Sequence, residues 1–277
     1  MEIFIAEHSG FCEGVQRAYR MAKEQAKNNL PVYILGDLVH NAEVIKELEK
    51  LGIKIIKKIE HVKEEKAILI ISAHGVSPKV ISEAAEKGYT IVDTTCPWVA
   101  KAQKLAKSLS EEGFHVVVVG DKGHREVEGV LGWANHQASV VNHVDEIPKK
   151  DKIGVIAQTT QSQKKFNEIS QSIKAQEVKI FNTICKATEF RQNAAIGLAR
   201  RVDLMLVIGD QLSANTKRLK ELCEENNCQT FQIQTAQELN DKWFMGKQKI
   251  GITAGASTPD WVISEVISKI KSCAKPA

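Results

Sequence analysis

Three stretches of this 277-residue chain share one form: a short apolar run, a turn that contains a cysteine, and then a helical pattern. The clearest is YTIVDTTCPW, where a predicted strand at 90–92 leads to Cys96 and Pro97 opens a helix. Proline is tolerated there because the N–H it lacks would be unpaired anyway. The other copies contain Cys12 and Cys185, and a glycine follows each cysteine by 24 residues. Such a repeat is typical of stacked or symmetric units, so we expect three equivalent modules.

The repeat continues into residues that could carry chemistry. The positions 28 and 30 residues after each cysteine hold, in chain order, His40, His124 and Ser213, and Ala42, Glu126 and Asn215. A third strand end follows in SAHGVS, AQTTQS and TAGAST, where we align Ala73, Ala157 and Ala254. The last copy lacks a final strand with a cysteine, whereas the chain begins with one. We therefore expect the N-terminal strand at 3–5 to complete the third module.

Apolar runs alternate with helical patterns rich in lysine and glutamate, which is typical of βαβ units and parallel sheets. We therefore predict an α/β fold of three pseudo-symmetric domains with parallel sheets. The expected boundaries are 13–95, 96–182 and 183–277, the last completed by residues 1–12.

Composition excludes several classes of function. Hydrophobic residues make up 43% and charged residues 26%, and the net charge of 38 − 34 = +4 is too small and dispersed to indicate nucleic acid. No apolar run approaches the ~18 residues of a membrane span, and we see no signal peptide. Six cysteines in so long a chain do not form a disulfide scaffold, so we expect a cytoplasmic location. Neither a GxxxxGK[ST] loop nor a GxGxxG fingerprint indicates a nucleotide.

Ligands of open parallel sheets gather beyond the carboxyl ends of the strands, where the three repeated cysteines lie. A closed zinc site usually takes four ligands with paired spacing, while an open three-ligand zinc site stays possible. A [4Fe–4S] cluster prefers thiolates, and three cysteines would leave one iron open to a substrate. The simplest alternative is three small buried side chains, but equivalent placement in three repeats argues against it. Cys223, Cys228 and Cys273 lie outside the repeat and are expected to be structural.

Polar residues at the same strand ends suit an anion, most simply a phosphate or a diphosphate. They are the loop histidines His40, His74 and His124, with Ser213, Asn215 and Ser257 from the third module. Glu126 is the carboxylate nearest to this set in sequence, and Thr159 in AQTTQ supplies a hydroxyl at the matching strand end.

These segments resemble the 4-hydroxy-3-methylbut-2-enyl diphosphate reductase family of iron–sulfur enzymes. The matching motifs are GFCEGVQRA, GDLVHN, SAHGV, DTTCPWV, GHREVEG, AQTTQS, TICKAT with RQ, and TAGASTPDW, and they cover nearly the whole chain. The resemblance implies a trefoil of three α/β domains around a [4Fe–4S] cluster. It also implies Cys12, Cys96 and Cys185 as cluster ligands. The substrate-binding positions it implies are His40, His74, His124, Thr159, Ser213, Ala214, Asn215 and Ser257, with Glu126 as the proton donor.

The implied reaction is the reductive dehydroxylation of (E)-4-hydroxy-3-methylbut-2-enyl diphosphate to isopentenyl and dimethylallyl diphosphate. It is the last step of the non-mevalonate isoprenoid pathway, and we expect Glu126, Thr159 and His124 to be catalytic. The expected partners are the allylic diphosphate and an electron donor such as ferredoxin or flavodoxin, with no nucleic acid and no membrane.

The sequence departs from the family at three places, which bear on substrate affinity more than on reaction type. Ala214 replaces a usual serine, so one hydroxyl contact to the diphosphate is lost while its backbone N–H remains. Asp210-Gln211-Leu212 replaces a more basic loop, and Glu189-Phe190 replaces a commoner polar pair.

Two other functions stay open. A lyase resembling quinolinate synthase would also place three cysteines on one cluster, but it would bind dicarboxylates, and only Arg125 stands out in the strand-end loops. A non-enzymatic iron–sulfur sensor would not need Glu126, Thr159 and the anion-binding set.

Overall fold

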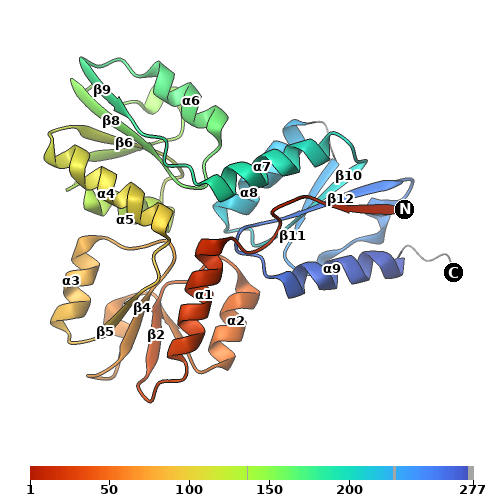
Figure 1. The fold of residues 1–277 in the computed structure, drawn as a ribbon, viewed down its shortest axis with the longest axis horizontal. Coiled ribbons are helices and arrows are strands. Elements are labelled where there is room, and N and C mark those ends of the chain that lie inside the picture. Colours follow the sequence, from red (N-terminus) through yellow and green to blue (C-terminus); the bar gives the residue numbers. More distant parts are fainter. Residues whose placement is uncertain (136, 227–228, 274–277) are drawn as a thin grey trace. The chain divides into compact units, whose positions relative to one another are not determined.

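The computed structural model describes residues 1–135, 137–226 and 229–273, and there it forms three four-stranded parallel sheets (Figure 1). The contacts divide the chain into two compact units. Unit one comprises Met1–Glu13, His40–Ala42 and Lys186–Ala277, and unit two comprises Gly14–Val39 and Glu43–Cys185. The predicted α/β class with parallel sheets is confirmed, whereas the domain boundaries at 95/96 and 182/183 stay a prediction.

Unit two holds two of the sheets. The strands of the first, in sheet order, are β3 (Lys54–Ile56), β2 (Val32–Leu35), β4 (Ile68–Ile71) and β5 (Thr90–Asp93). The strands of the second are β7 (Ala138–Val141), β6 (His115–Val119), β8 (Lys152–Ala157) and β9 (Glu177–Ile180). The helices are α1 (Glu13–Gln25), α2 (Ala42–Lys50), α3 (Pro78–Glu86), α4 (Pro97–Glu111), α5 (Arg125–Trp133) and α6 (Gln163–Ser172), with 3₁₀ turns at Ile59–His61 and Val144–Glu146.

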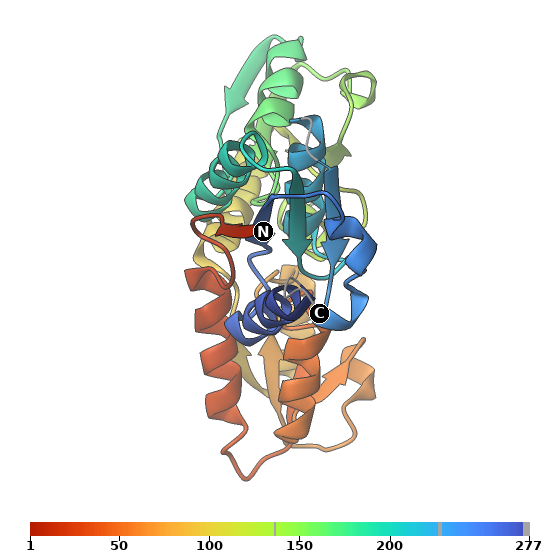
Figure 2. The same cartoon turned by 90° about the vertical axis from the view of Figure 1, so that its right-hand side faces the viewer.

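Unit one holds the third sheet, in the order β1 (Glu2–Ile5), β12 (Lys249–Ala254), β10 (Leu204–Ile208) and β11 (Gln229–Ile233). Its helices are α7 (Lys186–Ala199), α8 (Ala214–Glu225) and α9 (Asp260–Cys273), with 3₁₀ turns at Ala236–Glu238 and Asp241–Phe244. The N-terminal strand pairs with β12, Ile3 opposite Ile250, and its red ribbon lies among the blue strands in Figures 1 and 2. The prediction that this strand completes the third module is therefore confirmed.

The central strands are buried along nearly their whole length. Val116–Val119 in β6 and Leu204–Ile208 in β10 are at most 1% exposed. Continuous apolar runs of this kind are typical of parallel strands that helices cover on both faces. None of the helices in the described ranges is long and apolar enough to cross a membrane.

The strand register corrects one part of the predicted repeat. Leu35, Val119 and Ile208 each lie 23 residues after a repeated cysteine. They pair, in this order, with Ile71, Ala157 and Ala254. The predicted alignment of Ala73 with Ala157 and Ala254 was therefore wrong by two residues in the first module. There β4 ends at Ile71, and Ala73 belongs to the following loop, where its N–H donates to Leu38 O at 3.1 Å.

Two glycines test how tightly these sheets are packed. A Cβ on Gly154 in β8 would lie 2.7 Å from Leu109 Cδ1, whereas a Cβ on Gly197 in α7 would meet nothing within 4 Å. We expect Gly154→Ala to lower the free energy of unfolding by about 1–3 kcal/mol through overpacking. Gly197→Ala should raise it by up to about 1 kcal/mol, because alanine is the better helix former. Urea unfolding followed by circular dichroism measures both, and equal midpoints for the two variants would contradict the packing described.

Candidate functional site

The three repeated cysteines are held in the same way. Each is half-buried and directly precedes a helix, α1, α4 or α7. The N–H of each donates to a carbonyl two residues beyond the neighbouring strand end: Cys12 to Ala256 O at 3.1 Å, Cys96 to Ala73 O at 3.0 Å and Cys185 to Thr159 O at 3.1 Å. The start of a helix stabilises negative charge, so these turns suit anionic sulfur ligands. Cys12 lies in unit one, and the other two lie in unit two.

The remaining cysteines are a separate group. Cys223 on α8 is fully buried in an apolar cluster with residues such as Ala195 and Leu219, so its predicted structural role is confirmed. Cys228 lies outside the described residues. Cys273 ends α9, and its side chain lies outside what the structure describes.

Glu126 and Thr159 form a buried pair in unit two. Thr159 donates two hydrogen bonds to the carboxyl group, from its backbone N–H to Oε1 at 2.6 Å and from Oγ1 to Oε2 at 2.8 Å. The side chains belong to residues only 2% and 5% exposed. Burial raises the pKa of Glu126 from its ordinary 4.5 to about 7, against the opposing effect of the Thr159 bonds, and the Asp121 carboxylate raises it further. A carboxyl group in this state holds an exchangeable proton near neutral pH.

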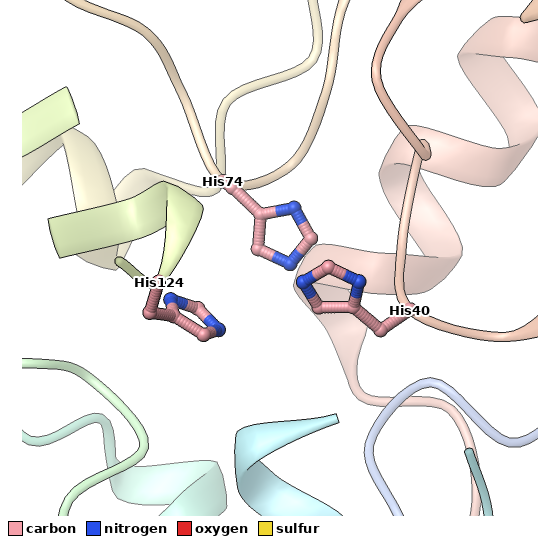
Figure 3. Close-up of side chains that lie close together, drawn as sticks. All are labelled: His40, His74 and His124. Carbon is pink, nitrogen blue, oxygen red and sulfur yellow. The ribbon is translucent and has the colours of Figure 1, made fainter. Parts of the chain in front are cut away.

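His124 directly precedes α5 and caps it. Its Nδ1 accepts a hydrogen bond from the N–H of Glu126 at 3.2 Å. An accepting nitrogen carries no proton, so the neutral ring has its proton on Nε2, where it can be donated to an anion. The ring of His74 meets the ring of His124 edge to face, with centroids 5.6 Å apart and an interplanar angle of 86° (Figure 3).

The loop that carries His74 is fixed by close packing against α4 and α5. A Cβ on Gly132 would lie 2.3 Å from Ser77 Cβ, and a Cβ on Gly75 would lie 2.4 Å from Gln103 Nε2. Trp133 Nε1 donates to Val76 O at 3.0 Å. Sequence reasoning missed these supporting residues, although the two glycines of the GVLGW segment were a signal for close helix packing.

In unit one, two hydrogen bonds hold the short segment that contains His40. Ser257 Oγ donates to His40 O at 2.9 Å, and the N–H of Ala42 donates to Asp210 Oδ2 at 3.2 Å. The predicted departure at Asp210 therefore has a structural role. Helix α2 begins at Ala42, so His40 lies one residue earlier than His124 and Ser213 do relative to their helices. Figure 3 labels His40 as well.

The start of α8 provides the other polar residues of unit one. Ser213 caps the helix, its Oγ accepting from the N–H of Thr216 at 3.3 Å, and Ala214 is the first helical residue. Asn215 is only 4% exposed, yet within the described part of the chain neither atom of its amide group has a hydrogen-bond partner. Buried amides are normally paired, so this one suits a bound ligand.

Arg191 on α7 is a further supporting residue that was missed. It is 2% exposed, and its Nη2 donates to Gly10 O at 2.7 Å. Gly10 adopts a φ of +91°, which favours glycine, and it lies two residues before Cys12. The buried guanidinium thus fixes the turn that presents this cysteine.

The raised pKa of Glu126 makes stability depend on pH. The folded state binds this proton more tightly than the unfolded state, so its contribution is full below about pH 4.5 and is lost as the pH rises to about 7. Glu126→Gln can keep both bonds to Thr159 without burying a charge. We expect it to raise the free energy of unfolding by about 3 kcal/mol at pH 8 and by nearly nothing at pH 4.5, since each pKa unit is worth about 1.4 kcal/mol.

Urea unfolding of the metal-free protein between pH 4.5 and pH 8 measures this difference. The control is Glu128→Gln, at an exposed position of the same helix, which should change stability little at any pH. A difference between wild type and Glu126→Gln that does not vary with pH would contradict the raised pKa.

Comparison with known proteins gives one consistent result. The sequence profile of the LytB protein family matches residues 3–271. The chain is 46% identical over 279 residues to the 4-hydroxy-3-methylbut-2-enyl diphosphate reductase of Geobacter metallireducens, covering 98% of this chain and 97% of that protein. It is 45% identical to the protein of the same name from Caldanaerobacter subterraneus, with coverage of 98% and 97%.

Solved structures agree with these relatives. The E-1-hydroxy-2-methyl-but-2-enyl-4-diphosphate reductase from Plasmodium falciparum superimposes with a TM-score of 0.92 at 30% identity, covering 99% of this chain and 88% of that one. A structure of (E)-4-hydroxy-3-methyl-but-2-enyl diphosphate reductase, described as the terminal enzyme of the non-mevalonate pathway, gives 0.71 at 40% identity, with coverage of 98% and 100%. The resemblance found in the sequence is confirmed, and the chain belongs to the LytB protein family.

Proposed function

We propose that this chain is an oxidoreductase that converts (E)-4-hydroxy-3-methylbut-2-enyl diphosphate to isopentenyl and dimethylallyl diphosphate. Its full-length relatives carry the name of that reductase. The observation within the chain that supports this chemistry best is the buried Glu126–Thr159 pair, because loss of a hydroxyl group as water requires a proton donor near neutral pH.

We infer that Cys12, Cys96 and Cys185 hold a [4Fe–4S] cluster. The donor set fits, since three thiol groups occupy equivalent turns at helix starts and thiolate is the usual ligand of iron–sulfur clusters. When bound, the cluster supplies electrons one at a time and an open iron that acts as a Lewis acid on the substrate oxygen.

The diphosphate would take the polar groups that both units provide. His124 offers Nε2–H, Asn215 offers a buried amide, and Ser213 still has its hydroxyl proton because its oxygen only accepts in the helix cap. His40, His74, Ser257 and the backbone N–H of Ala214 are proposed to complete the site. Neutral and charged donors of this kind, together with a helix N-terminus, bind phosphate oxygens well.

The proposed role of Glu126 is to give its proton to the substrate hydroxyl, which then leaves as water. The carboxylate that remains would be stabilised by the two hydrogen bonds from Thr159, one of them from a backbone N–H that no side-chain motion can withdraw. Burial excludes water that would otherwise compete as the proton source. Glu126, Thr159 and His124 are thus the proposed catalytic residues.

The rival functions find less support. The guanidinium group of Arg125, the cation that a dicarboxylate lyase would need, lies over Gly36, where a Cβ would come within 1.2 Å of its Nη1. A sensor gives no role to a buried carboxyl group that carries a proton at neutral pH. We further propose a cytoplasmic location and ferredoxin or flavodoxin as the electron donor.

The function is tested first through its cofactor. Anaerobically purified protein should contain iron and sulfide and should reduce the allylic diphosphate. We expect Cys12→Ser, Cys96→Ser and Cys185→Ser each to lose the cluster or most activity, because each removes one of three thiolates. Cys223→Ala, which alters a buried core position, should keep both. Full iron content and full activity in Cys96→Ser would refute the proposed ligands.

Asn215 tests the binding of the diphosphate. Asn215→Leu removes two buried polar atoms that have no partner among the described residues, so the ligand-free protein should become more stable by about 1–3 kcal/mol. Loss of a hydrogen bond to a charged ligand should weaken substrate binding by about 1.5–3 kcal/mol, roughly ten- to more than a hundredfold. Calorimetric titration with the diphosphate and urea unfolding measure the two effects. Unchanged affinity would place the diphosphate elsewhere.

Glu126→Gln tests the proton donor. The amide keeps the size and the bonds to Thr159 but has no proton to give, so cluster content and substrate affinity should be retained. Turnover should fall by about 10²-fold or more, the scale of a positioned general acid. Single-turnover kinetics with a pre-reduced cluster measures this step, and conversion at the wild-type rate would mean that another group supplies the proton.

A further inference from the structure

Gln158 joins the two loops that carry the catalytic residues of unit two. It is 2% exposed and follows the last residue of β8. Its Oε1 accepts from the N–H of Asp121 at 2.8 Å, and its Nε2 donates to Thr160 Oγ1 at 2.9 Å. Asp121 begins the turn that ends at His124, and Thr160 follows Thr159 directly. One buried side chain therefore ties both loops together.

The sheet itself does not need a glutamine at this position. The strand register places Gly255 at the equivalent point of the third module, one residue after Ala254. The N–H of Gly255 donates to Ile208 O at 2.8 Å, just as the N–H of Gln158 donates to Val119 O at 2.9 Å. A module can thus close its sheet with no side chain there, so the amide group of Gln158 serves the loops rather than the strands.

The neighbourhood leaves room for this side chain and for no other. A Cβ on Gly120 would lie 2.9 Å from Gln158 Oε1 and 3.0 Å from Gln158 Cβ. Glycine at 120 therefore lets the glutamine lie over the start of the loop. Between the tied loops, Thr159 reaches the carboxyl group of Glu126 with bonds of 2.6 and 2.8 Å. Bonds this short require the loops to keep one fixed separation.

We infer that Gln158 is a positioning residue for the proton transfer: it fixes Thr159 and the turn 121–124 relative to Glu126. The inference rests on the proposed function for its catalytic meaning. The charged and titratable groups around this point are Asp121 and His124 on the turn, His74 beside His124, and Arg125, whose guanidinium lies over Gly36. A displaced turn would move the first two relative to Glu126.

The test compares Gln158→Met with wild type as anaerobically prepared holoenzyme. Methionine has a similar length but makes neither hydrogen bond. We expect unchanged iron and sulfide content, a KM within about twofold, and a kcat lower by about ten- to a hundredfold, the usual effect of a misplacement near 1 Å. Gln158→Glu can make both bonds when protonated, so it should recover much of the lost kcat at pH 6 and little at pH 8.

A second readout does not depend on turnover. Infrared difference spectroscopy of the metal-free protein follows the C=O stretch of Glu126, assigned by its absence in Glu126→Gln. In Gln158→Met this band should titrate at a different pH from wild type. The matched control is Ser110→Ala, which loses a buried bond of 3.0 Å to Ala134 O near the end of α4 and should change neither kcat nor the band.

Wild-type kcat with an unchanged infrared titration in Gln158→Met would overturn the inference. So would a loss of kcat that accompanies lost folding or lost iron, because the role would then be structural only. If wild-type protein fails to reduce the diphosphate, the proposed function fails, while the infrared titration still decides whether Gln158 positions the pair.

Discussion

The hydrogen bond from each repeated cysteine N–H to the neighbouring strand-end loop is the constraint on which the rest of the structure depends. It recurs in all three sheets within 3.0–3.1 Å. In each case the cysteine follows an edge strand, β1, β5 or β9, and the acceptor follows the strand beside it. The bond therefore extends the ladder beyond the last strand residue and fixes the turn from which the next helix starts. Three sulfur atoms are presented by one backbone device used three times.

The Glu126 site shows which of two opposing effects is larger. Two hydrogen bonds from Thr159 favour the charged carboxylate, and burial disfavours it. Burial has the larger effect, so the pKa rises to about 7 rather than falling. The bonds then act as a limit, since without them the proton would be held too tightly to be given away. A general acid works best with a pKa near the operating pH, and the balance of these effects produces that value.

Much of this arrangement could be predicted from the sequence, because the repeat leaves clear marks. Strand, cysteine and helix recur with fixed spacing, which predicted three parallel sheets and the pairing of the N-terminal strand with the last one. The prediction slipped at Ala73 because an alanine happened to lie near each strand end, and only the register separates a strand residue from a loop residue two positions later. Spacing along a chain does not encode hydrogen-bond register.

Side-chain partners were beyond prediction for a similar reason. The cap on α5 that determines the proton position of His124 depends on the direction of a ring, and the amide of Asn215 looks in the sequence like any other polar residue at a helix start. The same holds for Gln158, whose two acceptor and donor partners lie 37 residues and 2 residues away.

Ser257 carries the argument from structure to substrate binding one step further. Its hydroxyl has a single proton, which it donates to His40 O at 2.9 Å. Binding to a diphosphate as proposed requires the same proton, so the two acceptors compete. A hydrogen bond to a charged group contributes about 1.5–3 kcal/mol, against about 0.5–1.5 kcal/mol for a neutral one, so the exchange is favourable by about 1 kcal/mol. The segment at His40 would then keep only its bond from Ala42 to Asp210, and it gains freedom to move as the ligand binds. The departure at Asp210 thus holds this segment through its backbone while the substrate takes over the hydroxyl of Ser257.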